Sequence, residues 1–135
     1  MIRTHTFRVR TRGHTDVLDI TPRVAETVRG RGVATVFVSG STAGITTVEY
    51  EPGLVQDLKD LFEKIAPERD AYHHHATGDD NGSAHVRAAL LGPSVSIPFS
   101  DGRLLLGTWQ QIVLVDFDTR PREREIIVQV ISDQA

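Results

Sequence analysis

The chain has 135 residues and a formal net charge of -3, and 39% of its side chains are hydrophobic. This length, without a break in composition, predicts one domain, residues 1–135, around one core. Because cysteine is absent, disulfide bonds, thiolate metal sites and a cysteine nucleophile are excluded. The negative charge argues against nucleic-acid binding, and no apolar stretch approaches the roughly 20 residues that cross a bilayer. We expect a cytoplasmic protein without nucleic-acid or membrane partners.

The first part of the chain shows strand and helix patterns in turn. Residues 5–11 alternate apolar and charged side chains, which predicts a half-exposed edge strand. A Thr-Pro start and a glycine stop predict a short helix between Thr21 and Gly30. The apolar run at 33–38 and the β-branched run at 45–50 predict two buried strands.

The clearest helix pattern begins at Pro52 and ends before Pro67, with its apolar side chains on one stripe. A long loop over 66–84 and a short helix over 85–91 follow. Three further strands are predicted at 95–99, 104–117 and 125–131. Strands and helices in separate runs predict an α+β fold with two main helices.

The loop at 66–84 and the residue after it hold the densest group of functional side chains. They contain the segments Tyr-His-His-His and Gly-Asp-Asp-Asn-Gly-Ser-Ala-His. A loop this long in a small domain is uncommon unless it is functional or disordered. Histidine and aspartate bind zinc and similar ions, but this spacing matches no strong signature such as His-Glu-x-x-His. A metal site and a solvated polar loop both remain open interpretations.

Two glycine-containing segments are also candidates. Gly107 beside Trp109 and Gln110, in an otherwise apolar strand, indicates a bulge that lines a site, or else a core tryptophan with amides at a sheet edge. The loop at 40–44, with Thr42 at its centre, either offers backbone N–H groups to a phosphate or makes a plain tight turn.

Arginines alternate near both ends of the chain. They are Arg8, Arg10 and Arg12, and Arg120, Arg122 and Arg124. Nucleic-acid binding is the least favoured use of them, because arginines alternating along strands more often form salt bridges or a solvated face.

Across nearly the whole chain, from about residue 5 to 131, the motifs resemble those of the YjbQ-like family, also called the secondary thiamine-phosphate synthase family. In chain order they are Ser-Thr-Ala-Gly-Ile-Thr, Glu-x-Glu-Pro-Gly-Leu, Tyr-x-His, Gly-Asp-Asp-Asn-Gly, Ala-His-Val-Arg-Ala-Ala-Leu-Leu-Gly-Pro-Ser, Gly-Arg-Leu-x-Leu-Gly-Thr-Trp-Gln-Gln-Ile and Asp-Phe-Asp. The resemblance implies a compact domain of packed, mostly antiparallel β-sheets. It also implies a homotrimer with a polar pocket near the subunit boundary, where histidines surround an ion or anion.

The resemblance implies an enzyme that transfers a pyrimidine-methyl group from its pyrophosphate ester to a thiazole phosphate, with release of pyrophosphate. The alternative is a non-catalytic trimer that binds a metal ion, a phosphate or another small metabolite. His74 and His85 match the family's two histidines and are the candidate ligands of a divalent ion, zinc or magnesium. Asp80 matches its loop acid, and Arg87 is the nearest candidate cation for pyrophosphate; with His85 they form the candidate catalytic group.

Four residues are candidate contacts of a small phosphorylated metabolite. They are Trp109 and Gln110 of the aromatic-amide block, Glu49 after the Thr-rich strand, and Thr42. Many family members have histidine where this chain has Gly40 and Ser83. A site with fewer imidazoles would differ in metal affinity or identity.

Overall fold

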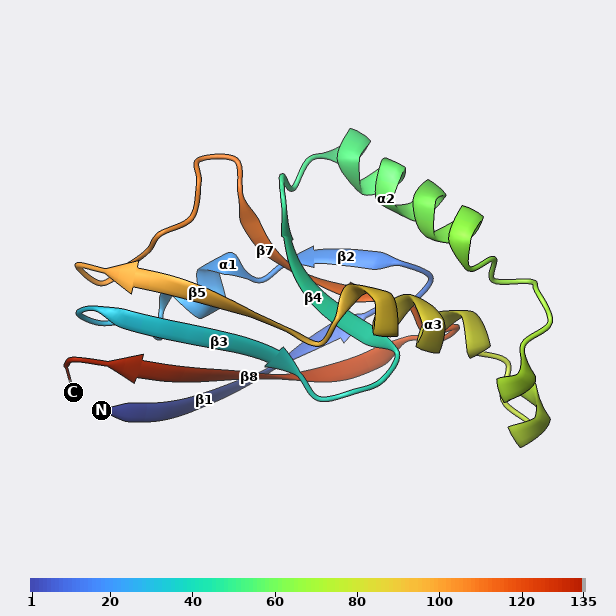
Figure 1. The fold of residues 1–135 in the computed structure, drawn as a ribbon, viewed down its shortest axis with the longest axis horizontal. Coiled ribbons are helices and arrows are strands. Elements are labelled where there is room, and N and C mark those ends of the chain that lie inside the picture. The colour runs from blue at the N-terminus through green and yellow to red at the C-terminus, as the bar shows by residue number, and fades with distance from the viewer. Residues whose placement is uncertain (135) are drawn as a thin grey trace.

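The computed structural model describes residues 1–134 as a two-sheet α+β fold (Figure 1). The strands are β1 (Ile2–Thr11), β2 (Asp16–Asp19), β3 (Gly32–Val38), β4 (Ala43–Val48), β5 (Ser94–Ser100), β6 (Arg103–Leu104), β7 (Gln111–Asp116) and β8 (Arg122–Ser132). The helices are α1 (Thr21–Ala25), α2 (Pro52–Ile65), α3 (Gly82–Leu91) and the 3-10 helix η1 (His73–Thr77). Within residues 1–134, every helix is too short or too polar to cross a bilayer.

Both sheets are antiparallel, which confirms the expected fold class. The larger has the strand order β1-β8-β3-β5-β6 and the smaller β2-β7-β4. β1 pairs with β8 from Ile2 opposite Ile131 to Thr11 opposite Arg122. β1 therefore lies at the edge of its sheet, as its alternating pattern predicts.

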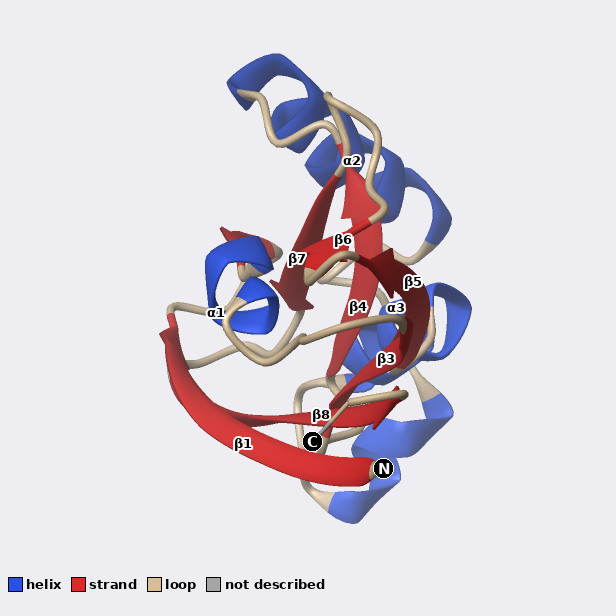
Figure 2. Cartoon of the chain, turned by 90° about the vertical axis from the view of Figure 1, so that its left-hand side faces the viewer, coloured by secondary structure: helices blue, strands red, loops and turns tan. Residues whose placement is uncertain are grey.

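The smaller sheet is the middle of three layers, between the larger sheet on one face and α2 and α3 on the other (Figure 2). Along β7, Ile112 and Leu114 face a core shared with the larger sheet, whereas Val113 and Val115 face a second core shared with α2 and α3. All four side chains are fully buried. Because β7 is covered on both faces, its sequence is a nearly continuous apolar run without alternation.

The opposite face of the larger sheet carries exposed apolar side chains. Ile2, Ile131 and Val33 stand opposite one another on β1, β8 and β3, and Phe37 lies farther along β3. All four are exposed. They form an apolar row on the surface of the single chain.

The prediction of a continuous strand over 104–117 is wrong. β6 ends at Leu104 and β7 begins at Gln111. Between them, the Gly107 N–H donates to Gln110 Oε1 at 3.0 Å, and the Gln110 N–H donates to Gly107 O at 3.1 Å. These local bonds replace sheet pairing and turn the chain out of the sheet.

Other boundaries also differ from the predictions. The three predicted helices are present, but α3 begins at Gly82, before the predicted start at 85. α1 ends at Ala25 and does not continue to Gly30. β2 has no counterpart among the predicted strands, because four residues, two of them aspartate, are too few for a periodic pattern.

Candidate functional site

The two candidate metal ligands, His74 on η1 and His85 on α3, lie against each other. Their ring centroids are 4.4 Å apart at an interplanar angle of 57°. The Nε2 atom of His74 is buried and has no hydrogen-bond partner in residues 1–134. That nitrogen keeps its hydrogen-bonding or metal-binding capacity for a further partner.

His85 is held in its neutral form. Burial lowers the pKa of His85 below its usual value and the neighbouring His74 lowers it further, whereas Asp118 and Asp79 act in the opposite direction. At neutral pH the imidazole is therefore uncharged, which is the form that binds a metal ion.

His85 also lines a hollow of about 370 Å³ between α3 and the loop that joins β3 to β4. Gly40 and Ser41 form the loop side, and Ala88 and Ala89 form the helix side. Because the other lining residues are small or apolar, His85 is the titratable side chain of this hollow.

Close packing at Gly82 sets the start of α3 beside η1. A Cβ atom on Gly82 would lie 2.5 Å from the Cβ of Tyr72 and 2.9 Å from Nε2 of His75. The Gly82 N–H donates to that Nε2 at 3.1 Å. Glycine at this position therefore lets η1 approach α3 closely enough for His74 to reach His85.

Two more polar atoms at the start of α3 are buried without partners. They are Oδ1 of the N-cap residue Asn81 and Oγ of Ser83. The amide of Asn81 is oriented by its Nδ2, which donates to Asp118 Oδ1 at 3.3 Å. Buried polar atoms normally have partners, so these two and His74 Nε2 mark a place where water, an ion or a ligand is expected.

A buried network of ion pairs lies next to the N-cap of α3 and the β3–β4 loop. Arg124 donates to Asp116 from Nε at 2.7 Å and from Nη2 at 2.9 Å, and Arg122 donates to Asp118 at 2.7 Å. Both aspartates are fully buried. Thr42 Oγ1 donates to Asp118 at 3.1 Å and accepts from Arg124 at 2.6 Å. The salt-bridge interpretation is therefore confirmed for Arg122 and Arg124, and the Thr42 hydroxyl is engaged within the protein.

Asp118 is the centre of this network. Burial by itself raises its pKa, but hydrogen bonds from the Thr119 backbone and from the side chains of Arg122, Asn81 and Thr42 outweigh burial and lower the pKa to about 2. Asp118 therefore stays ionised and links the N-cap of α3 to the β3–β4 loop. The Asp-Phe-Asp motif contains both aspartates of this network, but the sequence alone does not show which arginines pair with them.

Asp80 is exposed and lies apart from the His85 hollow. Its Oδ1 accepts a hydrogen bond from Thr119 Oγ1 at 2.9 Å, and it lines a polar hollow of about 640 Å³ with His14 and Glu68. In the described structure, Asp80 forms no hydrogen bond or ion pair with His74 or His85, although the sequence analysis grouped it with His85.

Arg87 is turned into the protein, which argues against its predicted role as the cation for pyrophosphate. Its side chain is 3% exposed. Nε donates to the Ala66 carbonyl at 2.9 Å, Nη1 to Thr15 Oγ1 at 3.1 Å and Nη2 to Glu63 at 2.8 Å. The guanidinium therefore ties α3 to α2 and to the β1–β2 turn.

The remaining candidates gather at the other end of the smaller sheet. Trp109 and Glu49 line a shared hollow of about 400 Å³, and Gln110 Nε2 donates to Thr47 Oγ1 at 3.1 Å. Trp109 is 73% exposed, so it is not a core anchor.

The length of β4 separates the two groups of candidates. β4 pairs with β7 from Ala43 opposite Asp116 to Val48 opposite Gln111. Its 6 residues span roughly 20 Å. Within one chain, the hollow lined by His85 and the hollow lined by Trp109 therefore lie beyond opposite ends of β4.

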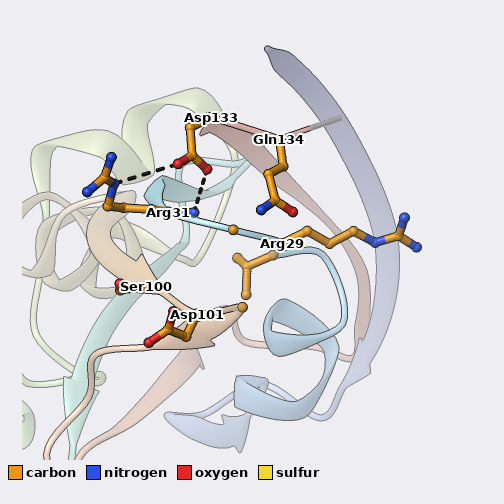
Figure 3. A pocket seen from close by; sticks show the side chains of 9 residues that line it. Arg29, Arg31, Ser100, Asp101, Asp133 and Gln134 are labelled. Atoms are coloured by element: carbon orange, nitrogen blue, oxygen red, sulfur yellow. Dashed lines mark hydrogen bonds and ion pairs between the residues drawn. The ribbon is translucent and has the colours of Figure 1, made fainter.

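A fourth hollow, of about 480 Å³, lies between the turn before β3, the β5–β6 turn and the C-terminal segment (Figure 3). Arg31 pairs there with Asp133 at 3.6 Å, and its N–H donates to Asp133 Oδ1 at 2.8 Å. The Arg29 side chain points away from Asp133 (Figure 3). These contacts hold loops together, and no histidine lines the hollow.

No group of three or more His, Asp or Glu side chains with the arrangement of a metal site occurs in residues 1–134. The pair of His74 and His85 therefore supplies at most part of a coordination shell, since zinc sites in proteins normally have three or four protein ligands.

Known relatives are similar over nearly the whole chain. The profile of a family described as "UPF0047 protein YjbQ-like" matches residues 5–133. A UPF0047 protein of Archaeoglobus fulgidus is 37% identical over 124 residues, which cover 91% of this chain and 97% of the relative. One of Synechocystis is 41% identical over 104 residues, which cover 76% of this chain and 71% of the relative.

Solved structures have the same fold. A hypothetical protein from Aeropyrum pernix K1 has a TM-score of 0.89 at 32% identity, covering 97% of this chain and 99% of that chain. A YbjQ-like protein of unknown function from Sulfolobus solfataricus P2 has a TM-score of 0.86 at 29% identity, covering 98% of this chain and 100% of that chain. With the match extending over residues 5–133, this chain belongs to the YjbQ-like, or UPF0047, family.

Proposed function

We propose that the protein binds a divalent metal ion through His74 and His85 and holds a small phosphorylated metabolite beside it. The observation that carries the proposal is the buried, unpartnered Nε2 of His74 next to the neutral imidazole of His85. Zinc suits two imidazoles better than magnesium does, because magnesium prefers oxygen ligands. A bound ion would polarise the phosphate oxygens of the metabolite.

The residues present fit such an ion with open coordination positions. The hydroxyl of Ser83 and Oδ1 of Asn81 are buried oxygen acceptors near the start of α3. Gly40 brings no side chain from the β3–β4 loop into the adjoining hollow. Water, the phosphate of the metabolite or a residue of a second copy must therefore complete the shell.

Replacing both His74 and His85 with alanine is expected to remove the bound metal. Protein purified without a His-tag would be analysed for zinc and magnesium after dialysis. The control is His73→Ala. His73 is the exposed neighbouring histidine on η1, and the ring that packs against His85 is that of His74. Equal metal content in the wild type and the double variant, or loss of metal in the control as well, would contradict the ligand assignment.

We also propose a homotrimer in which two copies share each site. Trp109 and Glu49 lie roughly 20 Å from the loop before β4 in the same chain, so one metabolite can reach both groups only across a subunit boundary. The apolar row on the larger sheet offers surface for such contacts. Light scattering should give about three times 14.9 kDa; a monomer or dimer at micromolar concentration would exclude the shared site.

A second candidate function is the family's implied reaction, transfer of a pyrimidine-methyl group to a thiazole phosphate with release of pyrophosphate. The exposed indole of Trp109 favours it, because it offers a stacking surface for a heteroaromatic ring. Departure of pyrophosphate requires positive charge near its oxygens. Since Arg87 is buried in contacts of its own, that charge must come from the ion held by the histidine pair.

Purified protein with both phosphorylated precursors is expected to form thiamine phosphate above the level of a sample without protein. Trp109→Leu should weaken use of the pyrimidine substrate, and the His74→Ala/His85→Ala variant should abolish the reaction. His73→Ala serves again as the matched control. If the wild type makes no product while metal binding is retained, the protein is a binding protein and the transferase proposal fails.

A further inference from the structure

Trp109 sits on a turn that holds it in solvent. The N–H of Gly107 and the carbonyl of Gly107 both bond to Gln110, at 3.0 Å and 3.1 Å, and the Gln110 amide donates to Thr47 of β4 at 3.1 Å. The turn is therefore tied to the smaller sheet. A large aromatic side chain that is 73% exposed gives up most of the stabilisation that burial provides, so in the single chain its surface is free to contact a ligand.

The hollow beside Trp109 is aromatic and acidic. Tyr50 lines it together with the three carboxylates Asp19, Glu49 and Glu51, and no Lys, Arg or His belongs to its described lining. Tyr50 is fixed, because its hydroxyl donates to the Val17 carbonyl at 3.1 Å. A smaller hollow of about 180 Å³ adjoins it and shares Tyr50 and Glu51.

Asp19, Glu49 and Glu51 form no ion pair within residues 1–134. Glu51 accepts from the backbone N–H groups of Gly53 and Leu54 at the start of α2, and Asp19 accepts from the Thr21 N–H at 2.9 Å. These donors are backbone N–H groups and carry no positive charge. Glu49 is exposed and has no ion pair in the described part of the chain.

Charge and shape together restrict what can occupy the hollow. An anion would be repelled by the three carboxylates. A hard metal ion needs several oxygen ligands that converge in one place, and no group of three or more His, Asp or Glu side chains with that arrangement occurs in residues 1–134. A cationic nitrogen on an organic group is attracted both by the face of an indole ring and by a carboxylate beside it.

We propose that this hollow binds an organic cation, with its charged nitrogen over the indole of Trp109 and against Glu49. This inference rests on the proposed function, because it takes Trp109 as part of the metabolite site. It adds that the part of the metabolite bound at Trp109 carries a positive charge. The metabolite then carries opposite charges at its two ends: a cationic organic group at Trp109, and a phosphate at the histidine pair.

Trp109 is the single tryptophan of the chain, so its indole N–H gives one assignable signal in a ¹H–¹⁵N spectrum. Choline is the probe, and 3,3-dimethylbutan-1-ol is its uncharged analogue of similar shape. Choline should shift the Trp109 signal saturably, and the alcohol should bind about tenfold more weakly, which corresponds to about 1.4 kcal/mol. Equal shifts with both, or no saturable shift with choline, would overturn the proposal.

Glu49→Gln keeps the size of the side chain and removes its charge, so it should weaken choline binding several-fold and leave the alcohol unaffected. Asp101→Asn is the matched control, because Asp101 is an exposed acid on the β5–β6 turn and belongs to a different hollow. An unchanged choline affinity in Glu49→Gln counts against the proposal. The metal analysis reports on His74 and His85 independently, so failure of one assay is separable from failure of the other.

Discussion

Replacing Asp116 with alanine is expected to lower the free energy of unfolding by about 3–5 kcal/mol, because it removes the nearer counter-charge of the buried Arg124 guanidinium and leaves only Asp118, at 3.8 Å. Asp116 is fully buried and Arg124 is 8% exposed. The two form two hydrogen bonds, at 2.7 Å and 2.9 Å, and Thr11 Oγ1 donates to the same carboxylate. Urea unfolding followed by circular dichroism measures the loss as a lower midpoint.

The control for this variant is Arg31→Ala, which removes an exposed ion pair between Arg31 and Asp133. Exposed pairs contribute little, so a change within about 0.5 kcal/mol is expected. Asp116→Asn, which keeps the shape and removes the charge, should fall between the two. If Asp116→Ala and Arg31→Ala unfold at the same urea concentration, the buried network does not stabilise the fold.

Replacing Arg87 with methionine should lower the free energy of unfolding by about 3 kcal/mol. The methionine fills part of the space but leaves the Ala66 carbonyl and the Thr15 hydroxyl without their donor, and each unsatisfied buried group costs about 1–3 kcal/mol. Arg87 also pairs with Glu63 at 2.8 Å, but Glu63 is 55% exposed and this pair contributes less. Thermal and urea unfolding both measure the effect.

The same variant decides between the two roles of Arg87. A structural role predicts lower stability with the metal content of the folded protein unchanged. Arg87→Lys keeps the positive charge but loses the planar guanidinium with its several N–H donors. Its stability should therefore lie between those of Arg87→Met and the wild type. Wild-type stability in Arg87→Met, combined with loss of phosphate or pyrophosphate binding, would restore the ligand role.

Local patterns in the sequence predicted the elements whose burial follows a simple period. The edge strand β1, the buried strand β3 and the amphipathic helix α2 lie close to where the alternation, the apolar run and the apolar stripe placed them. The capping of α2 is local as well, since Glu51 binds the N–H groups of Gly53 and Leu54 directly after it. The positions of these elements are set mainly by residues that are close to one another in the sequence.

The misplaced boundaries depend on contacts that no local pattern contains. The apolar run over 104–117 looks like one strand, but the side chain of Gln110 closes a turn onto Gly107 and anchors it to Thr47. At the start of α3, Tyr72 and His75 of the preceding segment pack against Gly82, and the Gly82 N–H donates to Nε2 of His75. Side-chain hydrogen bonds and close packing outweighed periodicity at both places.

By itself, the sequence determined the family, the α+β class and the presence of His74 and His85 in one polar segment. Only the tertiary structure decided which candidates meet. Arg87 reaches Thr15, 72 positions away, and becomes structural, whereas Trp109 and His85 line different hollows, beyond opposite ends of β4, a strand roughly 20 Å long. The physical reason is that burial and hydrogen-bond partners, which fix a polar side chain's role, come from segments distant in the chain.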